Sequence, residues 1–245
     1  MKDKKEEIVL ARVEDACENL WEPRFFDFCD EAMQQKMTRI LNHAGCPYAF
    51  WGGFPSAGRK MLCVYPDYVD GEALEWPMMA ARFPREGDYG HRNVLGELMA
   101  LGITRECLGD ISLDDDEVQV VFAARIAPFI RQEFVKVKGR PIRAAFGGPE
   151  TIRDYPLHFE TLDVVAASPR VDGVLGKIWG MSRQNVVEAV KQGRVQVNYE
   201  EVAHRDARLE EGDIISFRGK GKARIDHFGG VTKKGNLRIT VKKYV

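Results

Sequence analysis

Residues 168–218 read SPRVDGVLGKIWGMSRQNVVEAVKQGRVQVNYEEVAHRDARLEEGDIISFR, and this stretch decides the fold of the C-terminal part of the chain. Ser168 and Pro169 are typical of a helix start, because a side-chain oxygen can cap the first turn and proline already has a helical φ. Gly180 is the permissive stop. The apolar residues between these signals recur at helical spacing and predict one buried stripe: Val171, Val174, Leu175 and Ile178.

A second short helix and two strands follow at once. Ser182 is the expected cap of this helix and Gly193 its end. Residues 194–198 alternate polar side chains with valine, which predicts a half-buried strand, and residues 214–218 predict another. The second helix has its own apolar stripe of Val186, Val187 and Val190.

The polar faces of the two predicted helices form a basic surface. At 100° per residue, Arg170, Gly173 and Lys177 share one flank of the first helix, while Gln184 and Lys191 share the outer face of the second. We call Arg170, Lys177, Gln184 and Lys191 the helix ridge.

Arg183 differs from the helix ridge, because its angle turns it toward the valine side of the second helix. An internal ion pair with Asp172 and a contact with a ligand are both compatible with that position.

The spacing of polar and glycine positions in this stretch resembles the alpha-L RNA-binding domain named after small-subunit ribosomal protein four. The resemblance rests on Arg170-x-Asp172, Gly180-x-Ser182-Arg183, Gly193-x-Val195-x-Val197-Asn198, Gly212-Asp213 and Arg218. The chain departs from that pattern with Val171 in place of leucine and with Tyr199 where glycine often follows the asparagine. Neither change removes a charge, and we expect the second to affect the turn between strand and loop.

Two upstream stretches are similar to the YlmH family, bacterial proteins that carry this domain at their C-terminus. They are Trp51-Gly52-Gly53-Phe54 through Arg59-Lys60-Met61-Leu62, and His91-Arg92-Asn93-Val94-Leu95-Gly96 through Leu101-Gly102-Ile103-Thr104-Arg105-Glu106-Cys107-Leu108-Gly109-Asp110-Ile111. The resemblance implies RNA binding on the large ribosomal subunit, near tRNA, in the handling of stalled nascent chains. Members of the family have also been described as cell-division-associated.

Charge is distributed unevenly along the 245 residues. The whole chain has 36 basic and 37 acidic residues, which by itself does not indicate a nucleic-acid partner. From Val165 onward, however, 16 Lys and Arg face 9 Asp and Glu, whereas the preceding residues hold 20 and 28. Such asymmetry predicts a basic binding domain attached to an acidic carrier.

The domain order predicts an α+β protein in three parts: a helical and hairpin domain at 1–72, a ferredoxin-like domain at 73–167, and the RNA-binding domain at 168–245 with its C-terminal strands. Residues 5–45 are expected to form two helices separated by Pro23, followed by strands at 48–50 and 60–65.

The central part has the signal order βαββαβ of ferredoxin-like and RNA-recognition folds. Its expected elements lie at 78–83, 90–101, 110–113, 118–122 and 123–133, and its last strand at either 134–137 or 161–166. The third strand reads VQVVF and lacks the Lys/Arg-Gly-aromatic signature. We therefore predict the fold without its base-stacking platform.

Further cations follow the two-helix stretch. Residues 219–224, GKGKAR, predict a flexible cationic loop, either a phosphate-binding loop or a solvated turn, and residues 237–242 predict a strand with one basic face. Together with the resemblance, these observations give the expected RNA contacts: Arg170, Lys177, Ser182, Arg183, Gln184, Lys191, Arg194, Arg218, Lys220 and Lys222.

Signals for other chemistry are weak. Asp172 lies in an Arg-Val-Asp triplet like the Arg-Leu-Asp of pseudouridine synthases, but inside the predicted first helix. The glycine pairs at 52–53 and 147–148 lack the Gly-x-Gly-x-x-Gly context of a cofactor turn, and the aspartates at 114–116 fit a solvated turn. We therefore expect a noncatalytic protein without a cofactor; an RNA-modifying enzyme and a cell-division adaptor stay open as alternatives.

The remaining expectations concern the cellular setting. The cysteines, Cys17, Cys29, Cys46, Cys63 and Cys107, are scattered and form no Cys-x-x-Cys, which favours reduced thiols and no metal site. No run approaches the roughly 20 apolar residues of a membrane span, and the N-terminal residues lack an apolar signal core. These features predict a cytoplasmic protein. The resemblance to the YlmH family implies a bacterial protein whose partners are ribosomal RNA and tRNA, and we expect a monomer.

Overall fold

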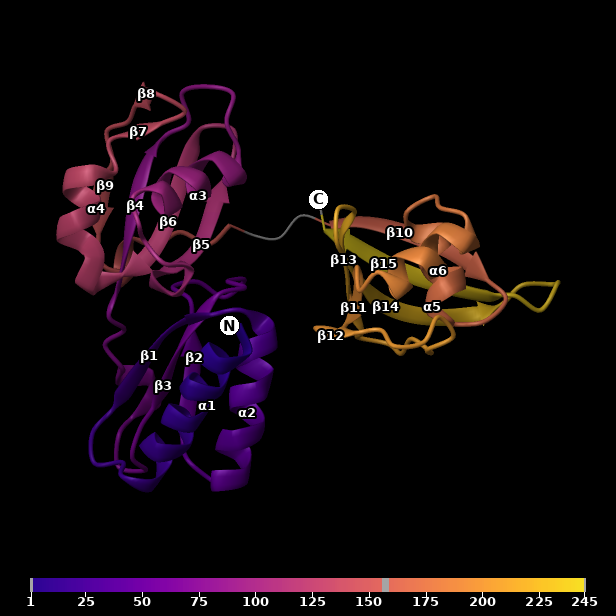
Figure 1. Ribbon diagram of the computed structural model, residues 1–245, viewed down its shortest axis with the longest axis horizontal. Coiled ribbons are helices and arrows are strands. Elements are labelled where there is room, and N and C mark those ends of the chain that lie inside the picture. The colour runs from indigo at the N-terminus through magenta and orange to yellow at the C-terminus, as the bar shows by residue number, and fades with distance from the viewer. Residues whose placement is uncertain (1, 156–158, 245) are drawn as a thin grey trace. The chain divides into compact units, whose positions relative to one another are not determined.

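The computed structural model describes residues 2–155 and 159–244 and has two compact units, Met1–Pro156 and Leu157–Val245 (Figure 1). Helices and antiparallel sheets occur in both units, as expected for the α+β class. In the described residues, no helix is both long enough and apolar enough to cross a membrane.

The first unit begins with a three-stranded antiparallel sheet in the order β1-β3-β2, next to two helices. Its elements are α1 (Lys2–Glu18), β1 (Arg24–Cys29), α2 (Glu31–Ala44), β2 (Tyr48–Trp51) and β3 (Lys60–Val64). The predicted helices and the two later strands are present, but β1 was missed. Its RFFDFC sequence pairs with β3, and Asp30 then caps α2 by accepting the N–H of Met33.

The second sheet of this unit has the predicted βαββαβ order, with strands arranged β5-β6-β4-β9. Short 3₁₀ turns, η1 (Gly71–Ala73), η2 (Arg105–Cys107), η3 (Ala124–Ile126) and η4 (Pro149–Thr151), connect its parts. The strands and helices are β4 (Met78–Pro84), α3 (His91–Ala100), β5 (Leu108–Leu113), β6 (Glu117–Ala123), α4 (Ala127–Glu133) and β9 (Ala145–Gly147).

Both expected positions of the last strand were wrong. Lys136–Val137 is β7 and pairs with β8 (Arg140–Pro141) in a separate hairpin. Residues 161–166 belong to β10, which lies in the other unit. The strand that completes the sheet, β9, pairs with β4 and comes from the segment rich in glycine and proline. A short edge strand leaves too little periodicity to be read from sequence.

The two faces of this second sheet are both covered. One face packs on α3 and α4 through a core that includes Phe83, Val120 and Phe122. The other face, with Met78 and Val121, packs against Phe28, Phe54 and Met61 from the first 72 residues. The predicted lack of a base-stacking platform is therefore confirmed, and the shared core explains why the expected boundary at residue 72 does not separate two compact units.

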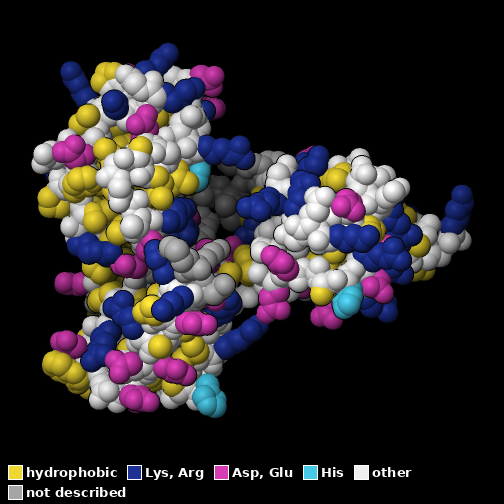
Figure 2. All heavy atoms as spheres, in the orientation of Figure 1, with side chains coloured by type: hydrophobic (Ala, Val, Ile, Leu, Met, Phe, Trp, Pro, Cys, Tyr) yellow, Lys and Arg dark blue, Asp and Glu magenta, His cyan; other side chains and the backbone are white. Residues whose placement is uncertain are grey.

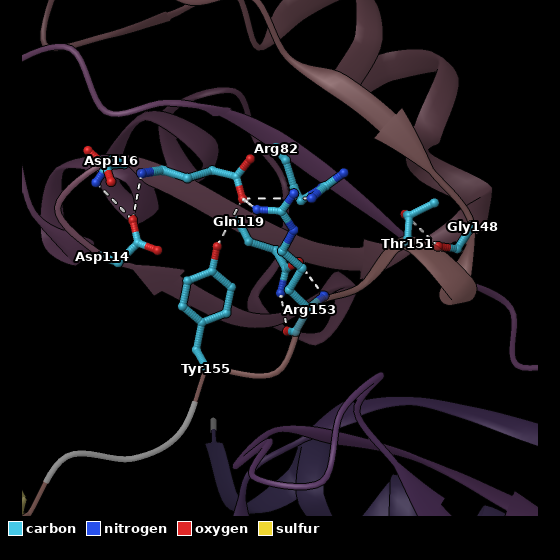
Figure 3. A network of polar contacts seen from close by, with 9 residues as sticks. Arg82, Asp114, Asp116, Gln119, Gly148, Thr151, Arg153 and Tyr155 are labelled. Atoms are coloured by element: carbon cyan, nitrogen blue, oxygen red, sulfur yellow. Dashed lines mark hydrogen bonds and ion pairs between the residues drawn. The ribbon is translucent and has the colours of Figure 1, made fainter.

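A polar network fixes residues 149–155 to this unit (Figure 3). Gln119 is fully buried; its Nε2 donates to the carbonyl of Arg153 at 3.0 Å, and its Oε1 accepts the N–H of Arg153 at 2.9 Å. Glu117 accepts from the Arg153 side chain at 3.0 Å and from the Tyr155 hydroxyl at 3.1 Å. Burial, followed by the Glu117 charge, raises the pKa of Tyr155 to about 12. The first unit thus extends through residue 155.

The second unit is a six-stranded antiparallel sheet, β10-β15-β14-β13-β11-β12, with two helices on one face (Figure 1). β10 pairs with β15 along its full length, from Phe159–Tyr244 to Ala166–Leu237, so the unit begins before the expected boundary at 168. Its elements are β10 (Phe159–Ala166), α5 (Val171–Ile178), α6 (Arg183–Lys191), β11 (Val195–Val197), β12 (Glu200–Glu201), β13 (Ile214–Phe217), β14 (Gly221–Val231) and β15 (Leu237–Tyr244).

The start and stop signals of α5 and α6 were mostly correct. Ser182 caps α6 by accepting the N–H of Asn185, and Gly180 and Gly193 have φ of 61° and 64° at the helix ends. Ser168 does not cap α5, which begins after Arg170. The chain before it is instead held by the carbonyl of Pro169, which accepts the N–H of Leu209.

Residues 219–224 are not a flexible loop. Only the tight turn around Gly219 separates β13 from β14, and β14 begins at Gly221, so Lys222 and Arg224 lie on a strand. The glycines in this segment favoured a loop, although the alternation of Ala223 and Ile225 toward the core already fits a strand.

Candidate nucleic-acid interface

The first turn of α5 places two arginines around one nearly buried carboxylate. The Asp172 side chain is 6% exposed and lies 3.1 Å from Nε of Arg183 through Oδ2 and 3.5 Å from Nε of Arg170 through Oδ1. The arginine side chains are 61% and 39% exposed. The ion pair between Arg183 and Asp172 is therefore present. Arg170, expected to point outward without a partner, shares the same carboxylate.

The loop before β13 adds two cations that sequence reasoning missed. The carbonyl of Arg205 accepts the N–H of Asp172 at 3.1 Å, and Arg208 forms an isolated β-bridge with Arg170. Both arginines are exposed. Their signal was available in the run HRDAR at 204–208, but nothing local in that run shows that it folds back onto α5.

The rest of the helix ridge is exposed as expected. Lys177, Gln184 and Lys191 all face solvent, and within the described residues neither lysine forms an ion pair. The Ser182 hydroxyl is already used as the α6 cap, so its oxygen serves the helix itself. An added Cβ at Gly173 would lie 3.5 Å from Nη2 of Arg183, which shows how closely that guanidinium crosses α5.

A second group of expected contacts surrounds the β13–β14 turn. Nη2 of Arg194 donates to the carbonyl of Arg218 at 3.1 Å, and the N–H of Arg218 donates back to the Arg194 carbonyl at 2.8 Å. The Trp179 indole donates to the Lys220 carbonyl at 3.2 Å. These bonds fix the turn while the side chains of Arg218 and Lys220 remain exposed.

Lys222 lies apart from both groups. Its Nζ is 5.3 Å from the ring centroid of Tyr199 and 5.2 Å from that of Tyr244. Tyr199 has a φ of 68° and follows Asn198 at 49°, so the two-residue turn expected to need glycine forms with tyrosine. The contact with Lys222 gives the tyrosine ring a structural role at that position.

Lys and Arg side chains are spread across the visible face of this unit (Figure 2). Some of them are neutralised: Arg224 and Lys242 each lie 3.0 Å from a carboxylate oxygen of Asp226. Hydrogen bonds from Lys242 and then Arg224 lower the pKa of that carboxyl group. Lys177 and Lys191, without such partners among the described residues, keep their charge available to a ligand.

In the first unit, the two motif stretches meet at Arg59. Asp110 accepts the N–H of Gly58 at 2.6 Å, and Arg59 donates through Nε to the Leu108 carbonyl at 2.8 Å and through Nη2 to the Phe28 and Arg105 carbonyls at 3.0 and 2.9 Å. Burial and the neighbouring Arg59 lower the pKa of Arg105 to about 10. This arrangement joins the two sheets of the unit.

The matches to known proteins agree with this architecture. Residues 78–145 match the family model described as the putative RNA-binding domain in YlmH. A ribosome-associated protein quality control protein P2 from Bacillus subtilis (strain 168) is 28% identical over 220 residues, which are 89% of this chain and 86% of that protein. A structure described as cell division protein ylmH from Streptococcus pneumoniae matches with a TM-score of 0.54 at 16% identity, over 62% of this chain and 96% of that chain, which shows a shared fold.

These matches change the interpretation of the first unit. The RNA-binding family match falls on the βαββαβ domain, which lies in the part of the chain that the charge distribution predicted to be an acidic carrier. The protein thus carries an RNA-binding domain outside the residues selected from sequence. The chain is thus similar to proteins of the YlmH family, and its residues 78–145 match the putative RNA-binding domain of that family.

Proposed function

We propose that this protein is a noncatalytic RNA-binding protein that grips structured ribosomal RNA on the large subunit, near tRNA, during the handling of stalled nascent chains. The observation that carries the proposal is the nearly buried Asp172, which Arg183 contacts through Nε and Nη2 and which forms an ion pair with Arg170 at 3.5 Å. The quality-control role in the name of the Bacillus subtilis relative supports the same function.

The anchored arginines suit phosphate recognition. Arg183 holds the carboxylate through Nε at 3.1 Å and Nη2 at 3.4 Å, and a guanidinium fixed in this way loses little side-chain entropy when its remaining donors bind a phosphate. Lys177 and Lys191 extend the same basic surface along the exposed faces of α5 and α6. A rigid surface of this kind reads backbone geometry, because duplex RNA presents its base edges poorly. The alpha-L-type C-terminal module is thus proposed as the main grip on RNA.

The remaining expected contacts extend this grip to the β13–β14 turn. Arg194, Arg218 and Lys220 are proposed to reach phosphates from that turn, and Lys222 to contribute from its strand. Ser182 and Gln184 contribute polar groups at the start of α6. The protein is proposed to act in the cytoplasm as a monomer, without a cofactor.

The noncatalytic proposal is supported by the surroundings of Asp172. A catalytic aspartate needs access to its substrate, whereas this carboxylate lies within the first turn of α5 and is nearly covered by its two arginine partners. Its geometry fits an anchor for cations. Incubating the protein with ribosomal RNA should leave the mass of every RNA fragment unchanged; a new mass would instead support an RNA-modifying enzyme.

The experiment that tests the RNA grip is charge reversal on the helix ridge. The double variant Lys177→Glu/Lys191→Glu should bind ribosomal RNA much more weakly, and the dependence of log Kd on log salt should flatten by about one unit per lost phosphate contact. The matched control is Lys233→Glu/Lys234→Glu, the same charge change on the exposed β14–β15 turn of the same unit. Unchanged binding by a folded ridge variant, or an equal loss in the control, contradicts the proposal.

A further inference from the structure

The RNA-binding domain at 78–145 lacks the surface that related folds use for RNA. In RNA-recognition domains, aromatic side chains on the open sheet face stack on bases. Here that face is covered by Phe54, Met61 and Ile152, which pack on Met78 and Val121. RNA must therefore reach this domain from its helices, its hairpin or its edges.

One end of the domain is rich in exposed cations. The segment from α4 through β8 carries them within the sequence RQEFVKVKGRPIR at 131–143. Lys and Arg side chains project at the end of the unit where β7 and β8 lie (Figures 1 and 2). We call this set the basic hairpin: Arg131, Lys136, Lys138, Arg140 and Arg143, all exposed.

Hydrogen bonds hold the hairpin in place without neutralising its positive charges. Nζ of Lys138 donates to the Asp88 carbonyl at 3.0 Å, and Nη1 of Arg140 approaches the Glu86 carbonyl at 3.4 Å. The carboxylate of Glu97 accepts the backbone N–H of Lys138 at 2.9 Å. Within the described part of the chain, no member of the basic hairpin forms an ion pair, in contrast to Arg82, Arg125 and Arg153 of the same unit.

The lysine at the tip of the hairpin has a left-handed backbone conformation that asparagine or glycine adopts more readily. Lys138 has a φ of 50° and Gly139 a φ of 74°, the signature of a two-residue turn that favours Asn-Gly. A long side chain in this left-handed region costs about 1 kcal/mol or more relative to glycine. The strain is understandable where the positive charge at the tip has a use.

The basic hairpin leads directly into β9, which is an edge strand of the sheet. The positive charges of the hairpin attract an RNA backbone to this edge.

We propose that the basic hairpin is the RNA contact of the central domain and that it binds phosphates along the backbone of a folded RNA. Arg131 lies over the Phe146 ring at 4.5 Å from the centroid, so an arginine already occupies one face of this ring. Phosphate contact is therefore favoured over base stacking. The inference rests on the RNA-binding role of the protein but uses a surface in the other unit from the helix ridge.

The first test replaces the strained lysine. Lys138→Asn removes one charge and the Nζ hydrogen bond to the Asp88 carbonyl but supplies a residue that suits the turn. Stability against urea should therefore stay close to that of the wild type, while binding to protein-free ribosomal RNA weakens by about 3- to 10-fold. The matched control is Arg12→Gln, which removes one exposed charge from α1 of the same unit and should leave binding within about 2-fold.

The second test neutralises the hairpin more fully. Lys136→Gln/Arg140→Gln/Arg143→Gln should weaken binding by more than about 10-fold and reduce the salt slope by about one unit per contact. Wild-type affinity and slope in these folded variants, or an equal loss with Arg12→Gln, overturns the inference.

The same series separates the two RNA surfaces. Combined with Lys177→Glu/Lys191→Glu, the hairpin substitutions should weaken the residual binding further. If only the hairpin variants keep wild-type affinity for RNA, the inference fails and the proposed grip by the helix ridge stands. If only the ridge variant keeps wild-type affinity, that proposed grip fails and RNA contact by the basic hairpin stands.

Discussion

Nε of Arg183 lies 3.1 Å from Oδ2 of Asp172, with the carboxylate nearly buried and the arginine side chain 61% exposed. Such a pair is asymmetric: the carboxylate lies inside the domain and binds Nε and Nη2, while most of the arginine side chain is exposed. A negative charge placed in a surface that binds RNA is unfavourable by simple electrostatics, so its presence here needs a positioning role.

Asp172→Asn tests that role, because a net-charge effect and a positioning role predict opposite changes in RNA affinity. Removing a negative charge from a basic surface should tighten RNA binding if only net charge mattered. We expect weaker binding by several-fold, because Arg170 and Arg183 lose their common anchor, together with a loss of about 1–3 kcal/mol in the free energy of unfolding. Filter binding to ribosomal RNA and urea denaturation measure the two effects.

The comparison for this variant is Asp206→Asn, which removes an exposed carboxylate from the neighbouring loop. This control should bind RNA as well as the wild type or slightly more tightly. Tighter binding by Asp172→Asn as well would show that the carboxylate does not position the arginines.

Substitution by alanine at two glycines of α5 should have opposite effects on the stability of the protein. A Cβ at Gly176 would lie 2.9 Å from the backbone carbonyl oxygen of Met181, whereas at Gly173 the nearest atom is the flexible end of Arg183 at 3.5 Å. Gly176→Ala should therefore destabilise the protein by about 1–3 kcal/mol, because backbone must move. Gly173→Ala should be neutral or stabilising by up to about 1 kcal/mol through helix propensity. Equal urea midpoints for the two variants would contradict the close α5–α6 approach.

Arg59 is expected to be irreplaceable by lysine. Its Nε and Nη2 satisfy carbonyls of Phe28, Arg105 and Leu108, a forked geometry that a single ammonium group cannot reproduce. Arg59→Lys should cost about 2–4 kcal/mol in unfolding free energy by leaving carbonyls without donors. Arg125→Lys, at an exposed pair with Asp27, should cost less than about 1 kcal/mol. Similar losses of unfolding free energy in the two variants would contradict the role of Arg59 in joining the two sheets of the first unit.

The pKa of His91 is lowered, first by burial and then by the charge of Arg105. The folded protein therefore binds this proton less readily than the unfolded chain, whose histidine titrates near 6.5. Stability should fall as the pH drops below that value, because the unfolded state takes up the proton first. His91→Gln should reduce the difference in unfolding free energy between about pH 7.5 and about pH 5.5. An unaltered pH dependence would contradict this assignment.

Local signals explain which elements were predictable from sequence. The α5 and α6 regions contain caps, stop glycines and a clear apolar period, and both helices were found. β9 has three residues and was missed, because its identity depends on pairing with β4 from far along the chain. β10 was assigned to the wrong sheet for the same reason: strand sequence predicts extension but not the partner.

The residues of the candidate sites divide in the same way, into those that local sequence predicts and those that only the fold brings together. The Arg183–Asp172 pair was one of two interpretations of a helical angle; the structure contains the pair, and an RNA contact by Arg183 stays a prediction. Arg205 and Arg208 were missed because only the fold brings their loop to α5. The basic hairpin was missed because charge was summed over all residues before Val165, and that whole stretch has a negative net charge.

Gln119 should control the order of the segment that ends the first unit. Its side chain is fully buried and exchanges two hydrogen bonds with the backbone of Arg153 (Figure 3). Gln119→Leu keeps the volume but leaves that N–H and carbonyl without partners, at about 1–3 kcal/mol. Opening of residues 149–155 should become about 10-fold or more frequent, so trypsin should cleave after Arg153 correspondingly faster. Gln132→Leu, at an exposed site on α4, should leave cleavage unchanged; equal cleavage rates in both variants would mean that the buried amide does not hold the segment.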